Sequence, residues 1–251
     1  MAKYFVAATA VALTIGAAIF AEDKSPVGKS MESFSLPDVR TSKPVSLADF
    51  SDKKAVVVVF LGTQCPINNA YLPRLAELQK EYGGKGVQFL GINSIKTDNA
   101  EAVAEHAKKN DLPFPVLKDT NQRVADLFSA RRTPEAFVLD EKHIVRYRGR
   151  IDDRFGIDVQ RTKATKQELV DALDEVLASK TVTTPETEVA GCLITREHKA
   201  AEKATVTFTK DVSRILQKNC QECHRPGQIG PMPLISYEDA DGWSAMIREV
   251  V

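Results

Sequence analysis

Residues 56–66 read VVVVFLGTQCP, an unbroken apolar run that passes into a turn ending in a cysteine and a proline. Such a β-branched run is typical of a central strand covered on both faces. Beyond the turn, apolar residues recur at helical spacing until Gly83 and Gly84 end the helix. These residues are Tyr71, Leu72, Leu75, Leu78 and Tyr82. The stretch therefore places Cys65 between a buried strand and the N-terminus of a helix.

The alternation of strands and helices continues along the chain. Strands are predicted at 87–93, near 116–117, at 136–139 and at 144–147, and helices at about 99–110 and 120–128. A last helix is predicted to begin at Thr165, whose hydroxyl forms a capping box with Glu168. Its apolar face consists of Leu169, Val170, Leu173, Val176 and Leu177. The sequence predicts an α/β domain, a sheet with helices on both faces.

Composition sets broad limits on partners. The chain has 251 residues, 43% of them apolar, which is enough for one domain of ordinary size and a smaller unit. It carries 34 basic and 34 acidic residues, so no net charge draws it to nucleic acid or to an anionic membrane. Four cysteines are too few for a disulfide scaffold. We expect small molecules or other proteins as partners, and no nucleic acid.

The N-terminus reads as an export signal over residues 1–21. Lys3 precedes an apolar stretch at 6–20, and the polar chain begins directly afterwards. Roughly 15 apolar residues are short for a membrane span, which needs about 20. A signal peptide, with no stable membrane span after its cleavage, is therefore predicted. Ile19 lies three residues before a cut at Ala21, which keeps an uncleaved anchor as the alternative. In both cases the folded part is periplasmic or otherwise exported.

Near the C-terminus stands the pentapeptide CQECH, from Cys220 to His224. Two thiols separated by two residues form thioethers with the vinyl groups of one haem, and the adjacent histidine becomes an axial ligand of the iron. A zinc half-site or a disulfide is the alternative. Zinc takes four ligands, however, and Cys192 and His198 stand apart across a polar stretch. The motif predicts covalent haem c on Cys220 and Cys223, with His224 as the iron ligand.

The residues around the first cysteine resemble the thioredoxin and redoxin fold. The resemblance rests on the turn that leads from Thr63 to Cys65, on Pro73 eight residues later, and on Thr133-Pro134 before a core strand. It implies a proline that kinks the active-site helix and a cis Thr-Pro bond that faces the reactive cysteine. Residues 34–38 and 45–50 are similar to the N-terminal hairpin of the peroxiredoxin branch.

This resemblance covers about residues 26–195, and its closest form is the AhpC/TSA type of redoxin with an appended haem-binding segment. Residues 147–153 and 191–194 also look like that group. The resemblance implies a redoxin domain at 26–180, a linker at 181–204 that contains Cys192, and a small α-helical, cytochrome c-like segment at 205–251.

Cys65 is the residue on which catalysis depends in this interpretation. At a helix N-terminus, unpaired N–H groups and the helix dipole stabilise a thiolate and lower the pKa from about 8.5. A reactive thiol is therefore predicted. The alternative is a buried structural cysteine, since free cysteine is among the most buried residue types.

Two departures from the family pattern bear on the reaction. Asn68 stands where a thioredoxin-type dithiol has its second cysteine, and Gly62 stands where a peroxiredoxin has a threonine, with Thr63 one place late. Arg131 or Arg132, just before the expected cis-proline Pro134, is the candidate for the arginine that holds a peroxide in that family. A solvated basic pair is the alternative reading.

A lone reactive cysteine needs a second thiol to resolve its sulfenic acid. Cys192 is the candidate, because the Thr/Glu-rich stretch at 181–188 can return the chain across the domain. We expect a redox-active or structural disulfide between Cys65 and Cys192 in an oxidising compartment. The alternative is a small buried thiol beside Leu193 and Ile194.

Residues 148–153 are dense in charge. One reading is that they position a substrate or a partner. The other is a solvated strand end with local ion pairs, which are usually worth little energetically.

In the tail, Val212, Ile215 and Leu216 form one face of a short helix that ends at CQECH. This order is similar to the start of a cytochrome c domain, in which a loop proline carbonyl accepts the histidine Nδ1–H. Pro231 is the candidate, and an ordinary loop proline is the alternative.

The sixth iron ligand is not evident. Met232 lies close to the histidine in sequence, and Met246 lies on a helix-like stretch at 236–251, where a methionine is more often core. Redoxins with this appended segment resemble the chain up to its last residues and continue with a methionine-containing stretch, so the segment is expected to be incomplete.

Together these patterns predict an exported thiol-based oxidoreductase that acts on a peroxide, or in thiol and disulfide exchange, and is coupled to haem c for electron transfer. The expected partners are a small peroxide or thiol substrate and a redox protein. One alternative is an oxidoreductase acting on protein disulfides. Another is a non-catalytic thioredoxin-fold module that docks a partner beside a cytochrome. Nothing in the sequence shows that the two units touch.

Overall fold

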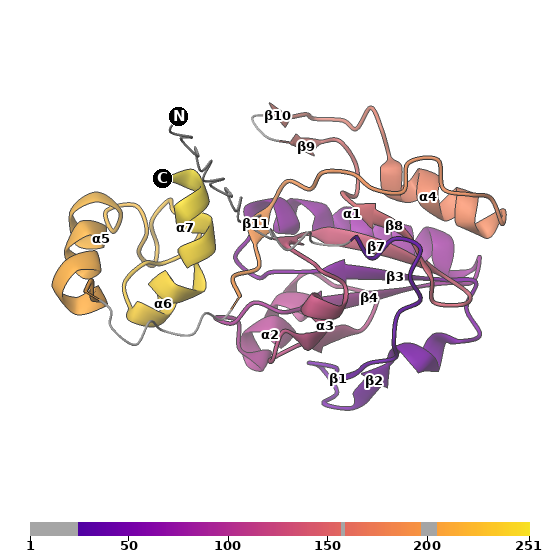
Figure 1. Cartoon of the computed structure of the whole chain (residues 1–251), viewed down its shortest axis with the longest axis horizontal. Helices are drawn as coiled ribbons and strands as arrows, with labels where there is room; N and C mark the ends of the chain where they lie inside the picture. The colour runs from indigo at the N-terminus through magenta and orange to yellow at the C-terminus, as the bar shows by residue number, and fades with distance from the viewer. Residues whose placement is uncertain (1–24, 157–158, 197–204) are drawn as a thin grey trace, which may run out of the picture.

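The computed structural model describes residues 25–156, 159–196 and 205–251. Its centre is a five-stranded mixed sheet in the order β5-β4-β3-β7-β8 (Figure 1). The strands are β3 (Ala55–Phe60), β4 (Val87–Asn93), β5 (Val116–Lys118), β7 (Glu135–Asp140) and β8 (Val145–Gly149). β3, β4 and β5 run parallel, whereas β7 and β8 are antiparallel to their neighbours. This sheet confirms the thioredoxin-like α/β fold that the sequence predicts.

The predicted central strand, β3, is buried along its whole length. Its side chains alternate between two cores, because successive residues of a strand point to opposite faces. Val57 and Val59 pack with α1 (Pro66–Gly83) and α4 (Glu168–Leu177). Val56, Val58 and Phe60 pack on the other face with α3 (Arg123–Leu127) and the N-terminal hairpin. The helices on both faces hold the end of β3 and the start of α1 rigidly in place.

Smaller elements surround this sheet (Figure 1). The expected N-terminal hairpin consists of β1 (Ser35–Pro37) and β2 (Pro44–Ser46), and a short 3₁₀ turn, Leu47–Phe50, follows it. The remaining elements of this part are α2 (Ala100–Lys109), β6 (Arg132–Thr133), β9 (Phe155–Gly156), β10 (Val159–Gln160) and β11 (Cys192–Leu193). β6 and β11 pair with each other outside the main sheet.

The last helix of this part begins later than predicted. α4 starts at Glu168, and the capping box expected from Thr165 is absent. Asp153 accepts hydrogen bonds from both the backbone N–H and the hydroxyl of Thr165, and Arg150 binds the Glu168 carboxylate. The two groups that were expected to cap the helix therefore have partners elsewhere.

Residues 205–251 form a small helical unit around Leu216, Leu234, Ala240 and Trp243. A π-helical turn, Phe208–Val212, leads into α5 (Ser213–Asn219), and α6 (Tyr237–Gly242) and α7 (Ser244–Val250) follow. Ile215 is 59% exposed, so the predicted apolar face of α5 is wrong at that residue.

The predicted signal segment at 1–21 lies outside the described residues. Within the ranges that the structure describes, no helix has the length and apolar character needed to cross a membrane.

Candidate active site

Cys65 is the N-cap residue of α1, as the turn after β3 predicts. The backbone N–H of Asn68 points at its sulfur, with a distance of 3.5 Å between Asn68 N and Cys65 Sγ. The thiol is 1% exposed. Free N–H groups and the dipole of an 18-residue helix favour negative charge at this position.

The loop before β7 faces this sulfur. The peptide bond between Thr133 and Pro134 is cis, as the resemblance implies. Cys65 Sγ lies 3.0 Å from the carbonyl oxygen of Thr133. β6, which ends at Thr133, therefore forms one wall of the site.

β11 brings the second cysteine to the same place. Cys192 is the register partner of Thr133 in the antiparallel β6–β11 pair. Its backbone nitrogen lies 3.4 Å from Cys65 Sγ, and its thiol also hydrogen-bonds that sulfur. Both thiols are free in this structure. Two residues that are 127 positions apart in sequence are thus in direct contact.

The contact shifts the pKa values of the two thiols in opposite directions. The Cys192 thiol first, and then the backbone N–H groups of Asn68 and Cys192, lower the pKa of Cys65 to about 6, against the effect of burial. The pKa of Cys192 is raised, because its thiol donates to the Cys65 sulfur, because it is buried, and because the Cys65 charge is close. Arg132 opposes that rise in the pKa of Cys192. At neutral pH the negative charge therefore belongs to Cys65.

A glycine permits the approach of β11. Gly191 has φ +151°, and a Cβ built there would lie 2.1 Å from the Thr133 carbonyl oxygen. Arg132 Nη1 donates to the Gly191 carbonyl at 2.7 Å, and Ile194 N donates to the Arg131 carbonyl at 2.7 Å. Sequence reasoning missed this role, although a glycine directly before a cysteine is its visible signal.

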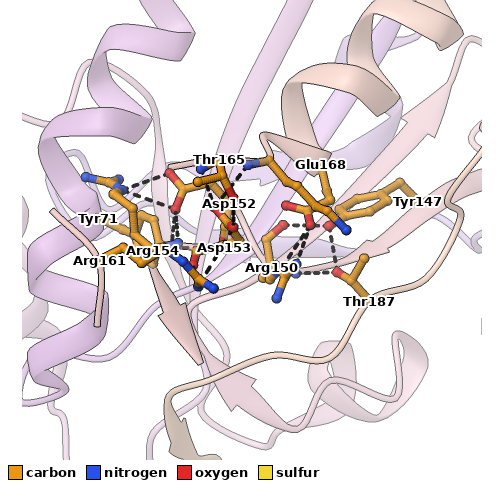
Figure 2. Close-up of polar contacts among 11 residues, drawn as sticks. Tyr71, Tyr147, Arg150, Asp152, Asp153, Arg154, Arg161, Thr165, Glu168 and Thr187 are labelled. Carbon is orange, nitrogen blue, oxygen red and sulfur yellow. Dashed lines mark hydrogen bonds and ion pairs between the residues drawn. The ribbon is translucent and has the colours of Figure 1, made fainter. Parts of the chain in front are cut away.

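The charged segment at 148–153 is buried, so its interpretation as a solvated strand end is wrong. Tyr71 Oη donates to Asp152 Oδ1 at 2.6 Å, and Arg150 N donates to Thr187 Oγ1 at 3.0 Å (Figure 2). Asp152 is 3% exposed. The segment ties α1 to the linker through Thr187.

Arg148 in β8 joins Glu135 of β7 to the linker residues Pro185 and Thr187. Its Nε donates to Glu135 Oε1 at 2.7 Å, and both side chains are buried. Its backbone N–H donates to Pro185 O at 2.9 Å, and its carbonyl accepts from Thr187 N at 3.1 Å. The linker is therefore held along β8, which directs the following residues toward Cys65.

Thr63 fixes the turn that precedes Cys65. Its hydroxyl and its backbone N–H both donate to Asp98, at 2.7 and 3.0 Å. Asn93 Nδ2 donates to the same carboxylate at 2.7 Å, and Asp98 is 3% exposed. Asn68, in place of a second cysteine, donates to the Gly62 carbonyl at 2.8 Å. Asp98 was not identified from the sequence, because its link to the turn spans two different strands.

Arg131 contributes its backbone to the site. Its N–H donates to Glu135 Oε2 at 2.7 Å, and its carbonyl accepts the Ile194 N–H. Its side chain lines a cavity of about 540 Å³ together with Arg148 and Glu186. That this guanidinium holds a peroxide stays a prediction.

The surroundings of CQECH fit a covalent haem. Cys220 is half-buried at the end of α5 and Cys223 is exposed. Met232 O lies 3.0 Å from His224 Nδ1, a contact that orients the ring and leaves Nε2 without this partner, as a haem ligand would require. Gly230 lies against the ring, where a Cβ would be 2.7 Å from Nδ1.

The prediction that the Pro231 carbonyl accepts the hydrogen bond from His224 Nδ1 is therefore wrong. The carbonyl of the next residue, Met232, lies at that position. Two backbone hydrogen bonds hold the loop in place. Gly230 N donates to Cys223 O at 2.8 Å, and Leu234 N donates to His224 O at 2.9 Å. Met232 lies midway between these two bonds and presents its carbonyl to the ring.

The C-terminal unit exposes several large apolar side chains. Exposed large apolar side chains of the described residues lie in 205–251, with Val159 as the exception. They are Val206, Ile215, Ile229, Ile235, Tyr237, Val250 and Val251. In the described ranges, no three His, Cys, Asp or Glu side chains gather to hold a metal ion.

The two units touch, a point that the sequence left open. Cys192 packs against the Leu216 and Trp243 core of the C-terminal unit. Arg132 Nη2 lies 2.6 Å from Glu249 Oε1, and Lys96 Nζ lies 3.3 Å from Asp241 Oδ2. The CQECH segment therefore belongs to a unit that contacts Cys192.

Comparison with known proteins matches residues 27–148 to the AhpC/TSA family. The chain is 31% identical over 120 residues to the thiol-disulfide oxidoreductase ResA of Bacillus thuringiensis subsp. konkukian, covering 48% of this chain and 67% of that relative. It is 32% identical over 132 residues to the thiol:disulfide interchange protein DsbE of Pseudomonas fluorescens biotype C, covering 51% and 69%.

A crystal structure of a hypothetical protein from Sinorhizobium meliloti 1021 matches with a TM-score of 0.63 at 30% identity, over 69% of this chain and 96% of that one. The family match includes Cys65 and Pro134 and ends before Cys192. On its sequence and its fold, the chain belongs to the AhpC/TSA family of thioredoxin-fold redox proteins.

Proposed function

We propose that this protein is an exported thiol oxidoreductase in which Cys65 attacks the substrate and Cys192 resolves the product, beside a unit that carries haem c. The contact of the Cys192 N–H and thiol with Cys65 Sγ carries the proposal. A reactive cysteine with a lowered pKa and a second thiol within reach are the two requirements of a dithiol cycle.

The cycle balances for both substrate classes. With a peroxide, the Cys65 thiolate takes one oxygen and the alcohol or water leaves. Cys192 then attacks the sulfenic sulfur, water leaves, and a disulfide forms. With a disulfide, Cys65 forms a mixed disulfide and releases one thiol, and Cys192 displaces the second thiol. In each case the dithiol loses two electrons, and an external thiol reductant returns them.

The directions of the two pKa shifts support attack by Cys65 before resolution by Cys192. Before the reaction, the hydrogen bond to the Cys65 sulfur, burial and the Cys65 charge all raise the pKa of Cys192, so it stays protonated. Once Cys65 is bonded to oxygen or to a substrate sulfur, its charge is gone, and of these causes only burial still raises the pKa of Cys192. Arg132 then favours the Cys192 thiolate. Resolution follows attack and does not compete with it.

In the C-terminal unit, Cys220 and Cys223 would hold haem c through thioethers and His224 would ligate the iron. The group supplies one-electron transfer when bound. The Met232 carbonyl orients the ligand ring. Met232 and Met246 remain the candidates for the sixth ligand. A visible spectrum of protein expressed with haem-maturation machinery tests this part, since loss of the haem band on denaturation would contradict covalent attachment.

The thiol cycle is tested by mixing reduced protein with hydrogen peroxide and, separately, with 2-hydroxyethyl disulfide. Wild type should form a Cys65–Cys192 disulfide with at least one of them. Cys65→Ser should consume neither, and Cys192→Ser should stop after one addition at Cys65. If wild type and Cys65→Ser react equally slowly with both, Cys65 is not catalytic and a non-catalytic binding module is the better account.

A further inference from the structure

The edge next to the reactive cysteine is already occupied by the chain itself. β11 pairs with β6, the strand that leads to the cis proline, through Cys192 and Leu193. An extended peptide that binds a sheet edge uses such backbone N–H and C=O groups. Here the Ile194 N–H donates to the Arg131 carbonyl, and Arg132 Nη1 donates to the Gly191 carbonyl. Both carbonyl groups therefore already have hydrogen-bond partners within the chain.

α7 in turn covers β11 (Figure 1). The guanidinium of Arg132 in β6 donates to the carbonyl of Gly191, directly before β11, and pairs with Glu249 of α7. The Cys192 side chain packs against the apolar core that contains Trp243. The C-terminal unit therefore lies over the resolving cysteine.

A second contact lies on the loop that follows β4. Lys96 pairs with Asp241 at 3.3 Å. Gly242 lies so close to Thr97 that a Cβ there would be 2.2 Å from Thr97 Cγ2. The unit is thus attached at both the β6 side and the β4 side of the site, and Cys65, which contacts Cys192, is 1% exposed.

We infer that the C-terminal unit restricts Cys65 to small substrates, such as a peroxide or a low-molecular-weight disulfide, and that Glu249 sets this restriction. The inference rests on the proposed function. A protein disulfide must bring its backbone to the sulfur. Even a weak encounter between two redox proteins buries protein surface, up to about 1,200 Å² in total. A small molecule needs only fluctuations of side chains and loops, whereas a protein must first displace α7 and β11.

The ion pair between Arg132 and Glu249 is the place to test this. Its side chains are 23% and 41% exposed, so breaking it should loosen α7 without unfolding the protein. Glu249→Lys opposes Arg132 with a like charge. Glu238→Lys, on exposed Glu238 of α6, makes the same charge change on a different helix of this unit and is the matched control.

The reduced full chain, expressed with haem-maturation machinery, is mixed with 2-hydroxyethyl disulfide or with insulin, and rates are followed by mass spectrometry of the peptide that contains Cys65. Wild type should react with the small disulfide much faster than with insulin. Glu249→Lys should raise the insulin rate by about fivefold and leave the small-disulfide rate unchanged. Glu238→Lys should match wild type in both.

Labelling gives a readout that needs no turnover. Cys65 of wild type should react with iodoacetamide but resist a maleimide that carries a long polyethylene glycol chain, and Glu249→Lys should admit both. Wild type that reacts equally with insulin and the small disulfide, or unchanged insulin and maleimide rates in Glu249→Lys, would overturn the restriction while leaving the thiol cycle intact. If Cys65 reacts with no disulfide or peroxide, the proposed function fails and the restriction with it.

Discussion

At the scale of single residues, Cys65 and Cys192 compete for one proton, and the donors around Cys65 decide the outcome. The Cys192 thiol contributes most to the lowered pKa of Cys65, ahead of the backbone N–H groups of Asn68 and Cys192. A hydrogen bond to a charged group is worth about 1.5–3 kcal/mol, and one pH unit corresponds to about 1.4 kcal/mol. The identity of residue 192 should therefore be visible in the reactivity of Cys65.

We expect the alkylation rate of Cys65 to rise as the pH passes through about 6 and then to level off, because the thiolate is the reacting form and protonation below the pKa removes it. Cys192→Ala should move this rise to higher pH by about one to two units. Cys192→Ser keeps a donor of similar reach and should stay near the wild-type profile. Iodoacetamide rates measured from acid to alkaline pH, with Cys65 located by peptide mapping, check the order of the three proteins.

At the scale of elements, β11 depends on a backbone position that excludes side chains. Gly191→Ala should push β11 away from β6, because the added Cβ meets the Thr133 carbonyl at 2.1 Å and φ is +151°. A misplacement of about 1 Å costs roughly a hundredfold in rate, so disulfide formation with Cys65 should slow by about that factor. Gly84→Ala, where a Cβ meets nothing within 4 Å, is the control and should behave as wild type. Normal disulfide formation in Gly191→Ala would show that β11 does not deliver Cys192.

β7, β8 and the linker are joined by the buried pair of Glu135 and Arg148. Arg148→Met should destabilise the protein by about 3–5 kcal/mol, since it leaves the Glu135 carboxylate buried without its cation. Arg146→Met on the same strand removes an exposed ion pair with Asp140 and should cost about 1 kcal/mol or less. Urea unfolding of the two variants gives the comparison, and equal stabilities would mean that the buried pair does not anchor the linker.

Elements whose signal is local were predictable from the sequence. The central strand β3, the strand β4 and the helix α1 follow from periodicity, and the position of Cys65 follows from the junction between β3 and α1. Elements that depend on distant partners were not. Asp153 accepts the hydrogen bonds of Thr165, so Thr165 does not cap the helix as predicted. The burial of residues 148–153 depends on the linker that lies along β8, which the local sequence does not show. The sequence named Cys192 as a partner for Cys65, but the strand that brings it there is too short to carry a pattern.

At the scale of the whole molecule, two units of unequal size meet at β11, which carries Cys192 (Figure 1). The AhpC/TSA part has two large cores, whereas residues 205–251 pack around a few apolar side chains. A unit with so small an apolar core usually needs a cofactor to stabilise it. Covalent haem on Cys220 and Cys223 would supply it.

The double substitution Cys220→Ala and Cys223→Ala should therefore remove covalent haem and make residues 205–251 sensitive to limited proteolysis. Disulfide formation between Cys65 and Cys192 should persist, because β11 is held by β6 and by Arg132. Haem absorbance after denaturation, proteolysis and non-reducing mapping separate the two effects. Loss of the disulfide together with the haem would mean that the C-terminal unit is needed to place Cys192.

The central claim is that Cys65 and Cys192 form one redox pair. Non-reducing peptide mapping of protein purified in air and treated with hydrogen peroxide tests it most directly. We predict a linked pair of peptides that contain Cys65 and Cys192, and its disappearance after reduction with dithiothreitol. Two free thiols at these positions under the same oxidising conditions would contradict the account.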